Sequence, residues 1–142
     1  MSDPFDLDRF VRAQDDRSTY AGALAELRRG RKVGHWVWFV FPQVGGLGSS
    51  PMSVRYALSG LAEARAYLAH PTLGPRLRKC CEALQALGTS DPVAVLGGID
   101  AVKVRSSMTL FAHAGDGTDG PFRAVLDRFY AGQEDDATLA RL

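Results

Sequence analysis

The sequence predicts an all-α protein, a single irregular domain of about seven to nine short helices. Helix start signals, in which a proline follows a capping residue, recur along the chain, and glycines stand where helices would stop. Between these signals apolar residues return at helical spacing, and no second segment offers itself as a partner for a strand. The start signals are Pro4, Pro51, Pro92 and Pro121, and the stop signals are Gly30, Gly88 and Gly132.

The first half of the chain divides into helices at these signals. Asp3 and Pro4 open the first helix, and a second covers residues 18–29. Ser50 and Pro51 restart a helix, and Ser59 can cap the next one. The apolar residues carried by these helices are Phe5, Leu7, Phe10 and Val11, then Tyr20, Leu24 and Leu27, then Val54 and Leu58, and then Leu61, Ala64 and Leu68.

The second half continues in the same way. A break at His70 and Pro71 precedes an amphipathic helix over 72–87, and Asp91 with Pro92 repeats the cap-plus-proline signal. A helix over 99–113, a loop over 115–120, a helix from Pro121 and a last short turn capped by Asp135 or Asp136 complete the chain. The residues expected in the core are Phe10, Leu24, Leu27, Trp38, Phe41, Leu77, Leu84, Phe111 and Phe129, with Val102, Met108 and Leu110 as further contacts.

The aromatic run from His35 to Phe41 can be assigned to a strand or to a helix. Its valines and aromatic residues suit a strand, but periodicity alone does not separate a buried strand from a buried helical turn. We favour a short buried helix, because a lone strand would leave its backbone groups without partners.

Length and composition limit the classes of function. The 142 residues suit one domain, residues 1–142, with 46% hydrophobic and 23% charged residues. A formal net charge of +1 gives no support for general binding to nucleic acid or to an anionic membrane. Cys80 and Cys81 are adjacent and form no disulfide framework. With no signal peptide and no apolar run long enough to cross a bilayer, we expect a cytoplasmic protein without a membrane partner.

One block, residues 28–53, combines a basic cluster, large aromatic residues and a glycine-rich loop. The backbone N–H groups of residues 45–50 could form an anion-binding nest, although a simple mobile loop accounts for the glycines equally well. Aromatic residues here could stack on a planar ligand, although such residues more often belong to the core. The candidate ligand-binding residues of this block are Lys32, His35, Trp36, Gln43, Gly46, Gly48 and Ser49.

A second candidate group lies on the expected helix 99–113. Asp100, Lys103 and Ser107 are spaced so that they share a helical face, and a lysine with a hydroxyl can hold a phosphate. A surface ion pair between Asp100 and Lys103 is the simpler interpretation. We add Lys103 and Ser107 to the candidate ligand-binding residues.

Standard motifs of catalysis are missing. The chain has no phosphate-binding P-loop, no complete dinucleotide fingerprint and no nucleophile elbow. Its histidines, His35, His70 and His113, have no metal-site spacing, so we expect neither a metal nor a cofactor. No residue can be assigned a catalytic role from the sequence.

Several motifs together resemble a known family. The central pattern is H-W-x-W-F-x-F-P-Q-x-x-G-L-G-x-S, which begins at His35. It is preceded by Phe10, Ala13 and Gln14 and by a Y-x-x-A-L-x-E-L pattern from Tyr20, and is followed by similar patterns over 63–77, 100–111 and 135–139. These residues resemble the bacterial family DUF1810, sometimes labelled calpastatin-like. The resemblance implies a small helical domain and supplies no function, and nothing in these residues supports a protease inhibitor.

A weaker likeness in size and helical content connects the family with the NADAR proteins, which are linked to NAD and ADP-ribose chemistry. Together with the candidate residues, it suggests a small anionic or nucleotide-like ligand and, if the protein is an enzyme, hydrolysis of an N-glycosidic bond. The alternative is a non-enzymatic protein-interaction module that uses the aromatic block. A pocket with convergent polar groups would favour the ligand, and a flat apolar patch would favour the interaction module.

Overall fold

The structure is a computed structural model that describes residues 3–115 and 120–142. Every regular element in these residues is helical, which confirms the predicted all-α class. The expected loop over 115–120 lies mostly outside the described residues. The helices are α1 (Asp8–Asp15), the 3₁₀ turn η1 (Asp16–Ser18), α2 (Thr19–Arg29), α3 (Val37–Val40), α4 (Pro51–Arg55), α5 (Leu61–Ala69), α6 (Leu73–Gln85), α7 (Pro92–Leu96), α8 (Gly98–Ala114), α9 (Gly120–Tyr130) and α10 (Asp136–Leu139).

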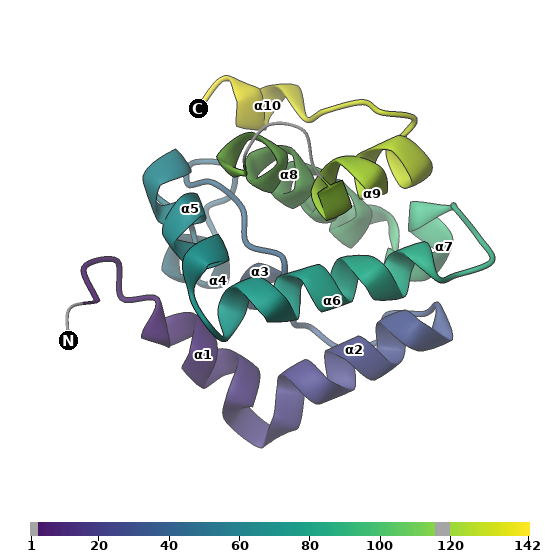
Figure 1. The fold of residues 1–142 in the computed structure, drawn as a ribbon, viewed down its shortest axis with the longest axis horizontal. Coiled ribbons are helices and arrows are strands. Elements are labelled where there is room, and N and C mark those ends of the chain that lie inside the picture. The colour runs from purple at the N-terminus through teal and green to yellow at the C-terminus, as the bar shows by residue number, and fades with distance from the viewer. Residues whose placement is uncertain (1–2, 116–119) are drawn as a thin grey trace.

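The longer helices form a stack around α6 (Figure 1). Helix α6 packs against α2 on one side and against α9 on the other. Helix α8 lies behind α9, and also contacts α5, α7 and the C-terminal α10. The short helices α3 and α4 belong to the winding segment between α2 and α5, and α3 contacts both α1 and α8.

Helix α8 has two different halves. Every residue from Ser106 to Ala112 is buried, so this half is enclosed on all sides by other helices. The first two turns bury Ala101 and Val104 but expose Ile99 and Val102. The prediction that Val102 is a core residue is therefore wrong, since its side chain is 60% exposed. This outward face of α8 forms part of the candidate site.

Local sequence signals account for several helix boundaries. The predicted helix start at Asp3 and Pro4 is wrong, because α1 begins at Asp8, although the Asp3 carboxylate does accept from the N–H groups of Leu7 and Asp8 there. The Asp91 carboxylate accepts hydrogen bonds from the N–H groups of Val93 and Ala94 at the start of α7. Asp135 caps α10 in the same way, through Thr138. Gly30 ends α2 with φ of 78°, a left-handed conformation that favours glycine. His70 does more than break a helix, because its Nδ1 accepts from the N–H groups of Thr72 and Leu73 at the start of α6.

The aromatic run becomes a helix, as favoured from the sequence. Helix α3 is one turn long and places Val37, Phe39 and Val40 in the core. The two tryptophans of this run differ: Trp36, just before α3, is buried, with 2% of its surface exposed, whereas Trp38, within α3, is only partly buried. The prediction of a buried Trp38 is wrong in that respect. The other predicted core residues, Phe10, Leu24, Leu27, Phe41, Leu77, Leu84, Phe111 and Phe129, are all buried.

Candidate functional site

Two adjoining cavities lie on either side of the exposed face of α8. The larger has a volume of about 480 Å³ and the smaller about 390 Å³, and both are lined by Gly98, Ile99 and Lys103. We refer to the two together as the α8 cleft. The larger cavity is also lined by Gln43, Leu47, Gly48, Ser53, Val102, Ser106, Asp135 and Ala137, and the smaller by His35, Trp38, Leu96, Gly97 and Asp100.

The wall that α8 contributes is a single helical stripe. Ile99, Val102, Lys103 and Ser106 are spaced three and four residues apart, so their side chains share one face. Ile99 is 77% exposed and Val102 is 60% exposed, so the mouth of the cleft is apolar. Ser106 is buried at the back of the larger cavity. An apolar mouth leading to a few polar groups is a common arrangement in small-molecule sites.

Lys103 lies where the two cavities meet. Its Nζ is 3.8 Å from Oδ1 of Asp100 and 4.8 Å from the centre of the Trp38 ring. The ammonium group therefore makes a cation–π contact and a long ion pair. The Trp38 Nε1 atom is buried and has no hydrogen-bond partner among the described residues. A buried polar atom without a partner, as at Trp38 Nε1, is unusual, and the half-buried Lys103 ammonium has only its long ion pair with Asp100.

Lys32 has a different role from Lys103. Its side chain is 4% exposed, its Nζ is 2.6 Å from Oδ2 of Asp100, and it also donates to the carbonyl oxygen of Gly34. Asp100 thus lies between two lysines, and the three groups carry one net positive charge. Because Lys32 is buried in its ion pair, Lys103 is the lysine of this group that can reach a ligand in the cleft.

Glu26 holds the segment that carries His35 and Trp36. Its Oε1 accepts hydrogen bonds from the N–H groups of Val33 and Gly34 and from Nε1 of Trp36, at 2.7 to 3.0 Å. Burial acts to raise the pKa of Glu26, but these hydrogen bonds and the nearby Lys32 charge outweigh it and lower the pKa below its ordinary value. The carboxylate therefore stays ionised and fixes the loop at the edge of the smaller cavity.

The glycine-rich segment is held by backbone pairing and by the C-terminus. Gly45 N–H donates to the Leu58 carbonyl at 2.8 Å, and Leu58 N–H donates to the Gln43 carbonyl at 2.9 Å. Gly46 has φ of 93°, and its carbonyl accepts from Arg141 at 3.0 Å. A Cβ atom on Gly46 would lie 2.7 Å from Nε of Arg141. These contacts give Gly46 a structural role.

A chain of hydrogen bonds connects two residues that line the larger cavity, Ser106 and Asp135, through the buried Thr138. Oγ of Ser106 lies 2.6 Å from Oγ1 of Thr138, and Thr138 donates to Oδ2 of Asp135 at 2.6 Å. The Asp135 carboxylate also accepts from the Thr138 N–H at 2.9 Å, as the cap of α10. The tertiary fold joins α8 and α10 through this chain and places a carboxylate in the cavity wall.

The structure brings only some of the sequence-based candidates into the cleft. Gln43, Gly48 and Lys103 line the larger cavity, and His35 and Lys103 line the smaller. Ser49 is exposed and lines neither cavity. Trp36 and Ser107 are enclosed in the core, with 2% and 0% of their surfaces exposed, Lys32 is in its buried ion pair, and Gly46 contacts Arg141.

Several cleft residues were missed from the sequence. Trp38 takes the place at the cleft that we assigned to Trp36, and Ser106 takes the place of Ser107. The stripe of Ile99, Val102, Lys103 and Ser106 is visible in the sequence as a helical spacing. It was overlooked because its apolar members look like core residues. For Asp135, the sequence indicated a helix cap but not a place in the cleft.

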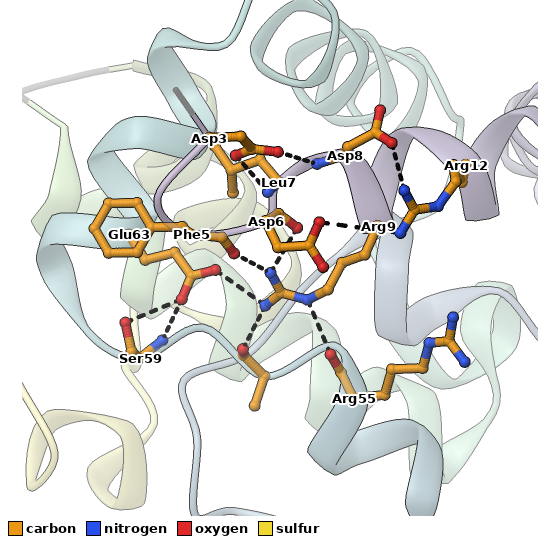
Figure 2. A network of polar contacts seen from close by, with 11 residues as sticks. Asp3, Phe5, Asp6, Leu7, Asp8, Arg9, Arg12, Arg55, Ser59 and Glu63 are labelled. Carbon is orange, nitrogen blue, oxygen red and sulfur yellow. Dashed lines mark hydrogen bonds and ion pairs between the residues drawn. The ribbon is translucent and has the colours of Figure 1, made fainter. Parts of the chain in front are cut away.

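A second polar cluster surrounds Arg9, near the N-terminus (Figure 2). Its guanidinium donates to the carbonyl oxygens of Phe5, Asp6, Arg55 and Ala57 and to Oε2 of Glu63. The other Glu63 oxygen accepts from the N–H and hydroxyl of Ser59. Ser59 therefore pairs with Glu63 instead of capping α5 with its side chain. All five N–H donors of Arg9 are used, which marks this cluster as structural.

The two cysteines and the possible metal ligands do not form a reactive or metal-binding site among the described residues. Burial raises the pKa of the Cys80 thiol to about 12 and that of Cys81 well above its ordinary value, so both stay protonated. Residues 3–115 and 120–142 contain no cluster of three histidine, cysteine or acidic residues that could hold a metal ion. In the same part of the chain, no helix is long and apolar enough to cross a membrane.

Comparisons with known proteins give the family of this chain. The family model described as "Protein of unknown function (DUF1810)" matches residues 4–142. The crystal structure of the conserved hypothetical protein Rv1873 from Mycobacterium tuberculosis is similar, with a TM-score of 0.94 and 51% sequence identity over 99% of this chain and 98% of that one. No curated protein matches. The chain therefore belongs to the DUF1810 family.

Proposed function

We propose that the α8 cleft binds a small nucleotide-like anion, and that Lys103 is the group that recognises its negative charge. The observation that carries the proposal is the position of Lys103 at the junction of the two cavities, with its Nζ above the ring of Trp38. A phosphate or carboxylate at this junction would gain a charge-assisted hydrogen bond. The Lys103 contact with Asp100, at 3.8 Å, is long enough to be replaced by it.

The shape of the cleft supports a molecule with a planar part. Cavities of this size are in the range of sites that hold small ligands. Trp38, Leu96 and Ile99 supply apolar surface in the smaller cavity, and His35 lies at its edge. The larger cavity adds Gln43, Ser53 and Asp135, which can exchange hydrogen bonds with a polar part of the ligand. A nucleotide has a planar base for the apolar surface, a polar sugar for the hydrogen-bonding residues and a phosphate for Lys103.

Hydrolysis of an N-glycosidic bond in an ADP-ribose or NAD-type ligand is the reaction that we would test first. Such a reaction passes through a positively charged, oxocarbenium-like state, and a nearby carboxylate stabilises it. Asp135 is the carboxylate in the wall of the larger cavity, and Asp100 is the one in the smaller. Product analysis after incubation with NAD or ADP-ribose would detect turnover. If the ligand binds but no product forms, we would conclude that the protein binds the ligand without hydrolysing it.

A protein-interaction module is the alternative function, and one observation favours it. Ile99 and Val102 are both exposed at the mouth of the larger cavity, where they could be covered by another protein. However, they flank a cavity with polar groups, whereas a protein-docking face is expected to be flatter and more continuous. We therefore give precedence to the small ligand.

The test is isothermal titration of the protein with AMP, and of two lysine variants. Lys103→Met keeps the length of the side chain and removes its charge, and we expect it to weaken AMP binding by about tenfold or more. Lys79→Met is the matched control, because Lys79 is an exposed lysine on α6 that lines neither cavity. AMP binding that is equal in both variants, or no binding to the unaltered protein, would contradict the proposal.

A further inference from the structure

The direction of the hydrogen bonds at the back of the larger cavity determines what Ser106 can offer a ligand. Thr138 has one hydroxyl proton, and it donates that proton to the Asp135 carboxylate at 2.6 Å. An ionised carboxylate has no proton to return. Oγ1 of Thr138 must therefore act as the acceptor in its 2.6 Å contact with Ser106, and the Ser106 hydroxyl is the donor.

The Ser106 hydroxyl can therefore only accept a further hydrogen bond, through its lone pairs. Its single proton is used on Thr138, while its remaining acceptor capacity is free to meet a ligand in the cavity that it lines. Ser106 is 1% exposed, so only a ligand group that lies directly against it in the cavity can form this hydrogen bond. A buried acceptor gains most from a ligand that donates a hydrogen bond, because an unmatched polar group is costly there.

We propose that the α8 cleft selects ligands that carry a hydroxyl donor, such as the ribose of a nucleotide, and that Ser106 accepts this hydrogen bond. This inference rests on the proposed function of the cleft. The donor is a hydroxyl and not an ammonium group, because Lys103 lines the same cavity and would repel a second positive charge. Burying a charge among apolar side chains costs far more than burying a neutral hydroxyl.

Thr138 and Asp135 act as positioning residues in this scheme. They do not need to touch the ligand, because they fix the orientation of the Ser106 proton through the chain of 2.6 Å contacts. If Thr138 lost its hydroxyl, the Ser106 proton would have no acceptor there and could turn toward the cavity. Ser106 could then donate as well as accept, so it would no longer be fixed as an acceptor and would also accommodate ligand groups that only accept.

The experiment compares AMP with 2′,3′-dideoxy-AMP, which has the same base and phosphate but lacks the ribose hydroxyls. We expect the unaltered protein to bind AMP about fivefold more tightly, the effect of one neutral hydrogen bond. Ser106→Ala should reduce this preference to about onefold while leaving the affinity for 2′,3′-dideoxy-AMP unchanged. Thr138→Val should lower the preference without abolishing it, because Ser106 keeps its hydroxyl but is no longer fixed as an acceptor, and Thr138→Ser, which keeps the hydroxyl, should retain it in full.

The outcomes separate this inference from the proposed function. Equal binding of the two nucleotides, with both still dependent on Lys103, would overturn the hydroxyl preference and leave the nucleotide site intact. Tighter binding of 3′-amino-3′-deoxy-AMP than of AMP would show that an ammonium donor is preferred and would also overturn it. Failure of both nucleotides to bind would remove both proposals together. Melting curves of each variant would show that any loss of preference occurs in a folded protein.

Discussion

Arg9 and Lys103 are both cations paired with acidic residues, but they use their partners to very different extents. Arg9 spends all five N–H donors on four carbonyl oxygens and Glu63, as Figure 2 shows. Lys103 has one ion pair, at 3.8 Å, and the face of Trp38. Arg9 therefore has no N–H donor left for a ligand, whereas Lys103, which lines a cavity, can still donate to one.

The same difference appears in what each cluster connects. The Arg9 cluster ties the segment before α1 to the end of α4 and to α5. Its acidic partner, Glu63, is 3% exposed and has both oxygens occupied. The α8 cleft is instead lined by Gln43, Lys103 and Trp38, of which Lys103 has one long ion pair and Trp38 Nε1 has no hydrogen-bond partner among the described residues. We therefore expect stability to depend on the first region and ligand binding on the second.

The largest expected effect on stability is at Glu63. Glu63→Ala would leave Arg9 without its ionic partner in a mostly buried place, and breaking such a pair costs about 3 kcal/mol. Urea denaturation would measure the loss in the free energy of unfolding. AMP binding by the folded variant should be unchanged. A loss below about 1 kcal/mol would show that the four carbonyl partners hold Arg9 without Glu63.

The cleft residues should show the opposite pattern. His35→Ala and Gln43→Ala remove side chains that line the two cavities, and neither side chain has a hydrogen bond within the described part of the chain. We expect each variant to lose the rise in melting temperature that AMP produces, while the free energy of unfolding without ligand changes by less than about 0.5 kcal/mol. If either variant instead melts several degrees lower without ligand, that residue belongs with the structural cluster.

The smallest effect is expected at Glu26, and it depends on pH. Because the pKa of Glu26 is lower in the folded protein than its ordinary value of 4.5, its contribution to stability is present above that pH and is lost as the pH falls through the folded pKa. Glu26→Gln keeps an acceptor oxygen but cannot titrate. Melting temperatures measured from pH 6 to pH 3 should therefore fall less steeply for this variant. Parallel curves would show that Glu26 contributes no such dependence.

The sequence by itself determined the helical class and most helix positions. Caps, prolines and stop glycines act within a few residues of one another, so their effects can be read locally, as at Asp91 and Gly30. The sequence also indicated Gln43, Gly48, His35 and Lys103, which the structure places in the cleft. Gln43, Gly48 and His35 stood out because they belong to the block around the aromatic run, and Lys103 stood out because it shares a helical face with Asp100 and Ser107.

Only the tertiary structure decided which member of each neighbouring pair faces the cleft. Adjacent helical residues point about 100° apart, so whether Ser106 or Ser107 faces the cleft is decided only by the packing of α8 against α9 and α10. The same holds for Trp36, which precedes α3, and Trp38, which lies within it: the choice depends on how α3 packs. The link from Ser106 through Thr138 to Asp135 spans more than thirty residues of chain, since Ser106 and Thr138 are 32 positions apart. No local pattern encodes such a contact, because it exists only once α10 has packed on α8.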